Sequence, residues 1–445
     1  MPGSINRRAV RWLRGQLPEL VAAGAISSES ARAIEHHYES VETKTNFGFV
    51  ILATVGTALV GAGIILIIAH NWDDLSRATR TVIAFVPLLI ALALVAFVLL
   101  RRHESRPWSE AVAVFDIAAV GTAISLISQT YQIQGSFDSF MRIWLVLSIP
   151  IVYLLRTTFG AILYVVGTVV WLFNRWTFLG AAQNPNFFWL LLLLIVPYFL
   201  IRYRQARDSR ETGALAVVLA LASIVALGFT ADYAKANLGG VGYAGLMATI
   251  YLCGMRFFPR TDERLSALAF VGGIGIGITA IVLSFESTWH MSRDVEWGKR
   301  SGDANLSLII ELLFPLAAIC LAGWDLLRKQ WRFSLSAAAF PIIAALAWVI
   351  TNLCEYSNTG TNCSFTAAIL INCYTLLLGI DILARGICTN SITRANFGLV
   401  LIAALAVSRF FDGDLSFITR GLGFIAVGGG FLFANVFLFK KRAAV

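Results

Sequence analysis

Charged residues are scarce in this sequence. Of its 445 residues only 14% are Asp, Glu, Lys or Arg, whereas 58% are hydrophobic. Soluble domains contain about 25% charged and about 45–50% apolar residues. The composition therefore excludes an ordinary soluble protein and predicts a membrane protein.

Hydrophobic runs recur along nearly the whole chain. Segments of about ten alternating apolar and polar residues, which are typical of outer-membrane barrels, do not occur. Runs of about 20 apolar residues, enough to cross about 30 Å of hydrocarbon, are abundant. Since backbone polar groups inside lipid must bond within the protein, we expect an all-α, polytopic membrane helical bundle.

Histidine and cysteine are few. The five histidines and six cysteines show no paired ligand spacing, so we expect neither a metal site nor a cofactor. Cys354 and Cys363 fall in one predicted external loop. In an oxidising compartment these two residues can form a disulfide, and two free thiols are the alternative.

The net charge of +9 does not indicate nucleic-acid binding, because the basic residues lie between the apolar runs. Their distribution is typical of topology signals, since Lys and Arg accumulate in cytoplasmic loops. Most of the 35 Lys and Arg residues fall on one side if the N-terminus is cytoplasmic. The sequence thus predicts that both termini are cytoplasmic, and we expect no signal peptide before the first span.

The apolar runs predict about fourteen spans within a transmembrane domain of residues 47–445. The predicted spans are 47–69, 80–100, 110–130, 141–155, 159–178, 186–201, 211–230, 239–258, 264–285, 306–327, 333–351, 364–384, 393–411 and 418–439. The ninth of them contains Gly272, Gly273, Gly275 and Gly277. Small residues at such spacing let helices approach closely in lipid, so we expect tight helix packing there.

Residues 1–46 precede the spans and show apolar residues at helical spacing. Gly24 is a plausible break, and the hydroxyl of Ser27 or Ser28 can cap a second helix. We predict a cytoplasmic helical hairpin that offers a docking site for a protein partner.

Three polar motifs lie at the predicted outer side of the membrane: 70–74, 129–134 and 409–414. In the third span, a polar stripe is formed by Thr122, Ser125, Gln129 and Gln132, which recur at three or four residues. Such a stripe faces a bundle interior or a water-filled cavity. We therefore predict an outward-opening polar cleft that binds a ligand. Its predicted lining is His70, Asn71, Trp72, Asp73, Gln129, Tyr131, Gln132, Arg409 and Asp412. The alternative is interfacial helix capping together with an Arg–Asp surface pair.

Isolated acidic residues occur within or near the spans. An ionised carboxylate deep in lipid costs roughly 2.5–3.5 kcal/mol, so each such residue marks a partner or a pathway. Asp381 lies one turn before Arg385, and Asp325 lies one turn before the basic residues Arg328 and Lys329, which predicts a local ion pair for each acid. Asp116 and Glu311 have no such neighbour, and we predict a role for them in proton or ion coupling.

The polar motifs also carry a family resemblance. The run Ala69-His-Asn-Trp-Asp-Asp-Leu-Ser, the run Gln129-Thr-Tyr-Gln-Ile-Gln-Gly with Trp144 beyond it, and Arg409-Phe-Phe-Asp-Gly-Asp resemble the bacterial domain of unknown function 2157 family. The likeness is clearest over residues 10–175 and 394–442. It implies a multi-pass protein of the bacterial cytoplasmic (inner) membrane. It implies no activity, because the function of that family is undefined.

Three functions remain open. The spans, their glycines, the predicted cleft and the partnerless acids favour a transporter or translocator of a lipid or small molecule. A non-catalytic sensor or assembly factor is the first alternative, with residues 1–46 as its docking segment. A glycosyltransferase-like enzyme with Asp73 or Asp74 in the first external loop is the second, but that loop leaves little room for an acceptor. A non-enzymatic function is therefore favoured, with membrane lipids and an unidentified ligand as partners.

Overall fold

A computed structural model describes most of the chain. The described residues are 7–39, 72, 74–102, 105–179, 184–207, 209–234, 238–258, 266–290, 302–328, 335–357, 363–389, 391–410 and the isolated positions 418, 421, 425, 428 and 429. Every element within these ranges is helical, which confirms the all-α prediction. The chain divides into two compact units, Met1–Arg80 and Thr81–Val445.

The first unit contains two helices that lie side by side, α1 (Arg7–Ala22) and α2 (Ser28–Glu39). The turn between them has Gly24 at φ +70°, a conformation that glycine adopts without steric cost. Ser27 Oγ accepts a hydrogen bond from the Ser30 backbone N–H at 3.1 Å and so caps α2. The cytoplasmic location of this segment and its role in partner docking stay predictions.

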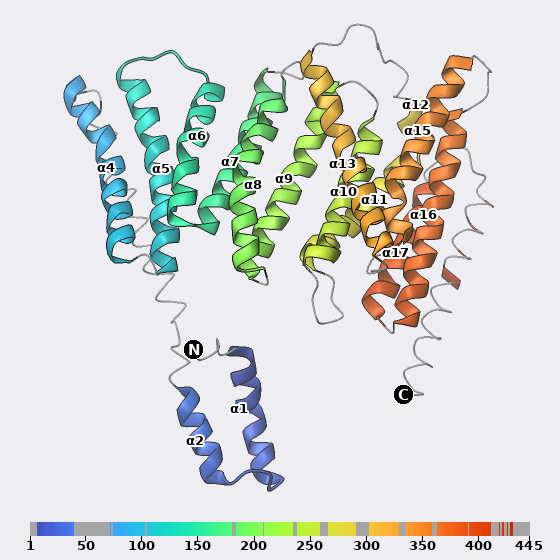
Figure 1. Ribbon diagram of the computed structural model, residues 1–445, viewed down its shortest axis with the longest axis horizontal. Coiled ribbons are helices and arrows are strands. Elements are labelled where there is room, and N and C mark those ends of the chain that lie inside the picture. Colours follow the sequence, from blue (N-terminus) through green and yellow to red (C-terminus); the bar gives the residue numbers. More distant parts are fainter. Residues whose placement is uncertain are drawn as a thin grey trace. The chain divides into compact units, whose positions relative to one another are not determined.

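The long helices of the second unit run alongside one another (Figure 1). They are α4 (Arg77–Arg101), α5 (Arg106–Thr130), α6 (Phe137–Leu155), α7 (Thr158–Leu179), α8 (Asn186–Gln205), α9 (Arg210–Ala234), α10 (Gly239–Phe257), α11 (Ala267–Leu283), α13 (Gly302–Leu327), α15 (Phe340–Ser357), α16 (Cys363–Cys388) and α17 (Ile392–Phe410). Two short helices, α12 (Glu286–His290) and α14 (Leu335–Ala338), lie between them in sequence.

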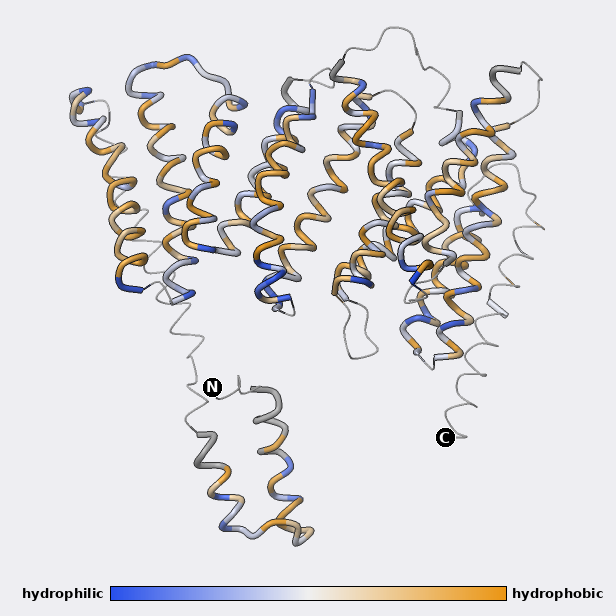
Figure 2. Tube along the Cα trace, in the orientation of Figure 1, coloured by the Kyte–Doolittle hydropathy of each residue, from blue (hydrophilic) through white to orange (hydrophobic). Residues whose placement is uncertain are grey.

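Nine helices within the described ranges are long and apolar enough to cross a membrane. Hydrophobic residues make up most of each of these helices, and hydrophilic residues are concentrated towards the helix ends (Figure 2). The multi-pass membrane architecture is thus supported. The total of about fourteen spans stays a prediction, because the predicted span 47–69 and most of 418–439 lie outside the described residues.

Helix α9 contributes to two hydrophobic cores through different residues. Leu215 and Ala226 belong to a core built by α4 to α9, which includes the fully buried Trp171. Ala216 and Leu227 belong to a second core built by α9 to α17. The α9 helix therefore joins the two halves of the unit.

Glycines of α10 and α11 bring the backbones of these helices into contact. A Cβ atom at Gly254 would collide with the backbone nitrogen of Ala269, and one at Gly272 would collide with that of Tyr251. A Cβ at Gly273 would meet nothing closer than 3.9 Å. The predicted tight packing of this span is confirmed, and Gly272 rather than Gly273 makes the contact.

A buried carboxylate joins α6 to α7. The Oδ1 atom of Asp138 accepts hydrogen bonds from Trp171 Nε1 at 2.9 Å and from Arg175 Nη1 at 2.8 Å. Its Oδ2 atom lies 2.7 Å from Arg142 Nη2. The Asp138 side chain is 8% exposed, whereas that of Arg142 is 43% exposed. The inner pair with Arg175 is therefore the one shielded from solvent.

Two predicted ion pairs have different outcomes. Asp381 pairs with Arg385 at 2.8 Å, as predicted. Asp325 was expected to pair with Arg328 or Lys329, but it pairs with Arg256 of α10. The Arg328 guanidinium instead stacks over the ring of Trp324, 4.4 Å from its centroid, and Lys329 lies outside the described residues. The prediction of a pair with Arg328 was therefore wrong, because it considered only neighbours in sequence.

We expect the Gly272→Ala variant to be destabilised, because its methyl group meets backbone that cannot rotate away. Such overpacking costs about 1–3 kcal/mol. The Gly273→Ala variant is the matched control, since its methyl group has space and a helical Gly→Ala change gains about 0.5–1 kcal/mol. Thermal unfolding of the purified variants in detergent measures both effects. Equal melting temperatures for the two variants would contradict the contact.

We also expect Asp138→Ala to destabilise the protein strongly, because it leaves the mostly buried Arg175 without its carboxylate. Removing one partner of a buried ion pair costs about 3–5 kcal/mol. Arg142→Ala should cost no more than about 1 kcal/mol, since that pair is solvent-exposed. Melting temperatures of the two variants test this order, and a larger loss for Arg142→Ala would refute it.

Candidate functional site

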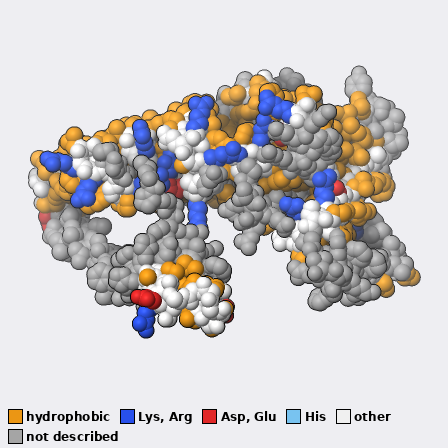
Figure 3. Space-filling model, turned by 60° about the horizontal axis from the view of Figure 1, so that its bottom comes forward, with side chains coloured by type: hydrophobic (Ala, Val, Ile, Leu, Met, Phe, Trp, Pro, Cys, Tyr) orange, Lys and Arg blue, Asp and Glu red, His pale blue; other side chains and the backbone are white. Residues whose placement is uncertain are grey.

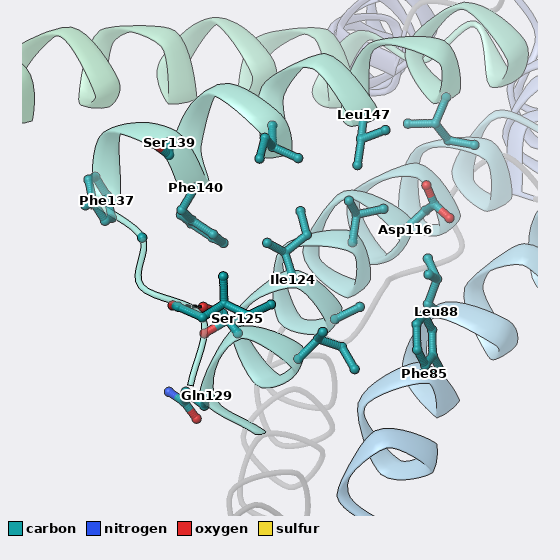
Figure 4. Close-up of a pocket in the computed structure, with 18 of the residues that line it drawn as sticks. Phe85, Leu88, Asp116, Ile124, Ser125, Gln129, Phe137, Ser139, Phe140 and Leu147 are labelled. Carbon is teal, nitrogen blue, oxygen red and sulfur yellow. Dashed lines mark hydrogen bonds between the residues drawn. The ribbon is translucent and has the colours of Figure 1, made fainter. Parts of the chain in front are cut away.

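An apolar groove of about 1220 Å³ lies between α4, α5 and α6 (Figure 4). Helix α4 contributes Phe85, Leu88, Leu92 and Val95, and α6 contributes the apolar residues from Phe137 to Leu154 that face them. Helix α5 forms the remaining wall from Asp116 to Gln129. We call this cavity the α4–α6 groove.

Two contacts link α4 to α5, or to the residue that follows α5, beyond the two ends of the groove. The hydroxyls of Thr81 and Tyr131 lie 3.1 Å apart and form a hydrogen bond at one end. The rings of Phe97 and Trp108 pack edge to face at the other end, with centroids 5.9 Å apart. All α4 residues that line the groove fall between Thr81 and Phe97 in sequence.

Trp144 fixes the distance between α5 and α6 beside the groove. Its Nε1 atom donates a hydrogen bond to the Ile117 carbonyl oxygen at 2.7 Å. The indole lies against Gly121, where a Cβ atom would be 3.0 Å from Nε1. The glycine thus leaves the space that the tryptophan fills. The hydrogen bond attaches α6 to α5 at Ile117, the residue that follows Asp116.

Among the described residues that line the groove, Asp116 is the one that is acidic. Figure 4 shows it between Leu88 of α4 and Leu147 of α6. The residue is 5% exposed, and its buried Oδ1 atom accepts no hydrogen bond from the described part of the chain. Asp116 lies near the middle of α5, so this carboxylate is placed deep among apolar side chains.

The polar lining residues gather at one end of the groove. Besides Gln129 they are Ser125, Ser128, Gln134, Ser136 and Ser139. Gln129 lies thirteen residues after Asp116, which corresponds to about 20 Å along the helix axis. The α4–α6 groove is therefore polar at this mouth and apolar along most of its length, with one carboxylate at depth.

The predicted cleft residues of the third span have separate positions. Gln129 lines the groove, Tyr131 bonds to Thr81 at its mouth, and Gln132 is exposed in the following turn at φ 50°. Ser125 of the predicted polar stripe lines the groove, but Thr122 donates to the Ala118 carbonyl oxygen.

Arg409 is not brought together with these residues. It donates a hydrogen bond to Ser284 Oγ at 3.0 Å, and its guanidinium lies over the ring of Phe285, 4.7 Å from the centroid. Helix α17 packs against α16 and α11, whereas α5 packs against α6 and α7. Figure 1 shows α5 and α17 far apart within the second unit.

Trp72 lies in the first unit, where the guanidinium of Arg80 is 5.8 Å from its ring centroid. The other predicted residues of the outer motifs, His70, Asn71, Asp73 and Asp412, lie outside the described residues. Their part in a ligand site stays a prediction.

The remaining predicted sites lie elsewhere in the second unit. Glu311 of α13 is 1% exposed and packs beside Gly242 of α10, so it does not line the groove. Cys363 is disulfide-bonded, and the side chain of its predicted partner Cys354 lies outside the described residues. In the ranges that the structure describes, no three His, Cys, Asp or Glu side chains gather as metal ligands.

The walls of the groove could not be predicted from the sequence. Phe85, Leu88 and Leu92 belong to an apolar run without polar residues, which looks the same whether it faces lipid, protein or a cavity. In the sequence, Trp144 was noted only as part of the family resemblance. Its hydrogen bond to a backbone carbonyl could not be predicted, because such a bond has no sequence pattern.

Comparison with known proteins gives one match. No curated protein and no solved structure matches the chain. The model of a family described as predicted membrane protein (DUF2157) matches residues 18–159, a range that includes every residue lining the α4–α6 groove. The resemblance of this membrane protein to the domain of unknown function 2157 family is thereby confirmed over residues 18–159.

Proposed function

We propose that this protein is a transporter or translocator of an amphipathic small molecule or lipid, and that the α4–α6 groove binds it. The observation that carries the proposal is the carboxylate of Asp116, which is 5% exposed and lines an otherwise apolar wall. The polar mouth at Gln129 is the predicted outer entrance.

The chemistry of Asp116 selects the ligand class. An ionised carboxylate in a membrane interior costs roughly 2.5–3.5 kcal/mol unless a partner offsets the cost. No described group donates a hydrogen bond to its Oδ1 atom. A ligand with an ammonium or another donor group supplies that partner, while its apolar body covers the walls of the groove.

The size of the groove fits such a ligand. Pockets for small molecules usually measure about 300–1,000 Å³ and are mostly apolar. The α4–α6 groove, at about 1220 Å³, exceeds this range and accommodates a long apolar chain. A small metabolite with many polar groups would leave most of these walls uncovered and its own polar groups unbonded.

Translocation follows from the depth of the carboxylate. Asp116 lies near the middle of a membrane-length helix, and substrate sites of many transporters lie near the bilayer midplane. Because a proton and a cationic ligand compete for the same carboxylate, Asp116 also offers a means of proton coupling. The separate prediction of a coupling role for Glu311 concerns a different part of the second unit.

The first test compares ligand binding by wild type and Asp116→Asn. Native mass spectrometry of the purified protein with dodecylamine, and with dodecanol of the same chain length, measures occupancy. Because a hydrogen bond to a charged group contributes about 1.5–3 kcal/mol, we expect Asp116→Asn to bind the amine about tenfold more weakly. Binding of dodecanol should change much less.

Asp232→Asn provides the matched control, since Asp232 is an exposed carboxylate of α9. This variant should bind dodecylamine as wild type does. Equal amine binding by wild type and Asp116→Asn would refute the role of the groove carboxylate.

The second test measures flux. Proteoliposomes loaded with a permanently charged fluorescent alkylammonium ion should release it faster than protein-free liposomes. Ser125→Trp should abolish this excess, because the indole fills the mouth of the groove without replacing Asp116. Val225→Trp, at a partly exposed position of α9 outside the groove, should retain it. Flux that persists in Ser125→Trp would exclude the groove as the pathway.

A further inference from the structure

A second groove of about 500 Å³ lies between α10, α11, α16 and α17. Its walls are mostly apolar and include Phe270 and Ile274 of α11 and Phe397 and Val400 of α17. Phe270 is 50% exposed and Val400 is 59% exposed, so the groove opens sideways between the helices. We call it the α10–α17 groove. It shares no lining residue with the α4–α6 groove.

One end of this groove is basic. Arg385 from the last turn of α16 and Arg394 from the first turn of α17 both line it. Asp381 neutralises Arg385 at 2.8 Å and also accepts a hydrogen bond from Ser336 Oγ at 2.5 Å. No carboxylate of the described residues pairs with Arg394. Within the described ranges, the mouth therefore carries one positive charge that no carboxylate neutralises.

Neutral polar groups and a helix end surround that charge. Thr389, Thr393 and Asn396 line the same end and provide hydroxyl and amide groups. The N-terminus of α17, which begins at Ile392, adds the partial positive charge of a helix dipole. Figure 3 views the protein from the lower side of Figure 1 and shows blue Lys and Arg side chains spread over that face.

We propose that the α10–α17 groove binds an anionic phospholipid, with its phosphate at Arg394 and an acyl chain along Phe270, Ile274 and Phe397. Charge complementarity selects the anionic headgroup, since basic residues at a membrane interface attract anionic lipids. The apolar wall that continues from the basic mouth selects a ligand with a chain. The sideways opening admits that ligand from the bilayer.

The topology predicted from basic residues places this mouth at the cytoplasmic side. The proposed lipid therefore comes from the cytoplasmic leaflet. Its binding site lies between the helices that pack most closely, α10 with α11 and α16 with α17. An occupied groove thus fills the space between two tightly packed helix pairs.

The test is native mass spectrometry of the full-length protein with phosphatidylglycerol or phosphatidylcholine of the same acyl chains. Wild type should bind phosphatidylglycerol more tightly than phosphatidylcholine. The Arg394→Gln variant should bind phosphatidylglycerol about fivefold more weakly, the effect expected from losing one basic residue near the lipid surface. Arg394→Lys should retain the preference, because it retains the charge.

Two further variants separate the charge from the cavity. Arg204→Gln removes an exposed basic residue at the end of α8, outside the groove, and should bind as wild type does. Gly273 lines the groove, and a Cβ there would make only an ordinary contact with Tyr251 at 3.9 Å, so the Gly273→Leu side chain should occupy the groove and weaken binding of both lipids. Thermal unfolding confirms that each variant compared is folded.

Equal affinity of wild type for the two lipids would overturn the proposal, as would unchanged phosphatidylglycerol binding in Arg394→Gln. Unchanged binding in folded Gly273→Leu would show that no acyl chain occupies the groove and would also overturn it. Glycerol 3-phosphate is the probe for a soluble ligand. If it displaces phosphatidylglycerol at equal concentration, the mouth recognises a free phosphate compound and the lipid proposal fails.

Discussion

The close approach of helix backbones at glycines is the constraint on which the second unit depends. Apolar side chains gain little by leaving lipid for a protein interior, so helix association in a membrane relies on packing. Gly254 and Gly272 give α10 and α11 such packing, and Gly386 does the same for α16 against Ala395 of α17. These contacts tolerate no additional methyl group, and they place the walls of the α10–α17 groove.

The α4–α6 groove lies beside a helix without such glycine contacts. Helix α4 contains no glycine, and Phe85, Leu88 and Leu92 face the groove. Its contacts with the region of α5 include the Thr81–Tyr131 hydrogen bond and the packing of Phe97 on Trp108. Helices α5 and α6 contain a single glycine, Gly121, and the indole of Trp144 occupies the space beside it. Glycine thus marks where the helix backbones of this unit approach one another most closely.

The sequence predicted helices and membrane insertion well, because both depend on local composition. It located a glycine-rich contact but did not distinguish Gly272 from Gly273, since crowded glycines occupy all faces of a helix. The positions of the helices within the membrane plane could not be predicted from the sequence. Topology assigns a motif to one side of the membrane but not to a place within the plane, so Gln129 and Arg409 were predicted together although the structure separates them. The prediction of an ion-pair partner for Asp325 was wrong for a similar reason, because its partner Arg256 lies on another helix.

The role of a buried carboxylate in this protein depends on the groups around it. Asp138 meets two arginines and an indole, and its charge is used to join two helices. Asp116 meets leucines, and its Oδ1 atom receives no hydrogen bond from any described group. Both residues are acidic and nearly buried, and both belong to the segment that matches the family model. The first is satisfied within the protein, whereas the second requires a proton or a ligand, which makes it the position from which a function is best inferred.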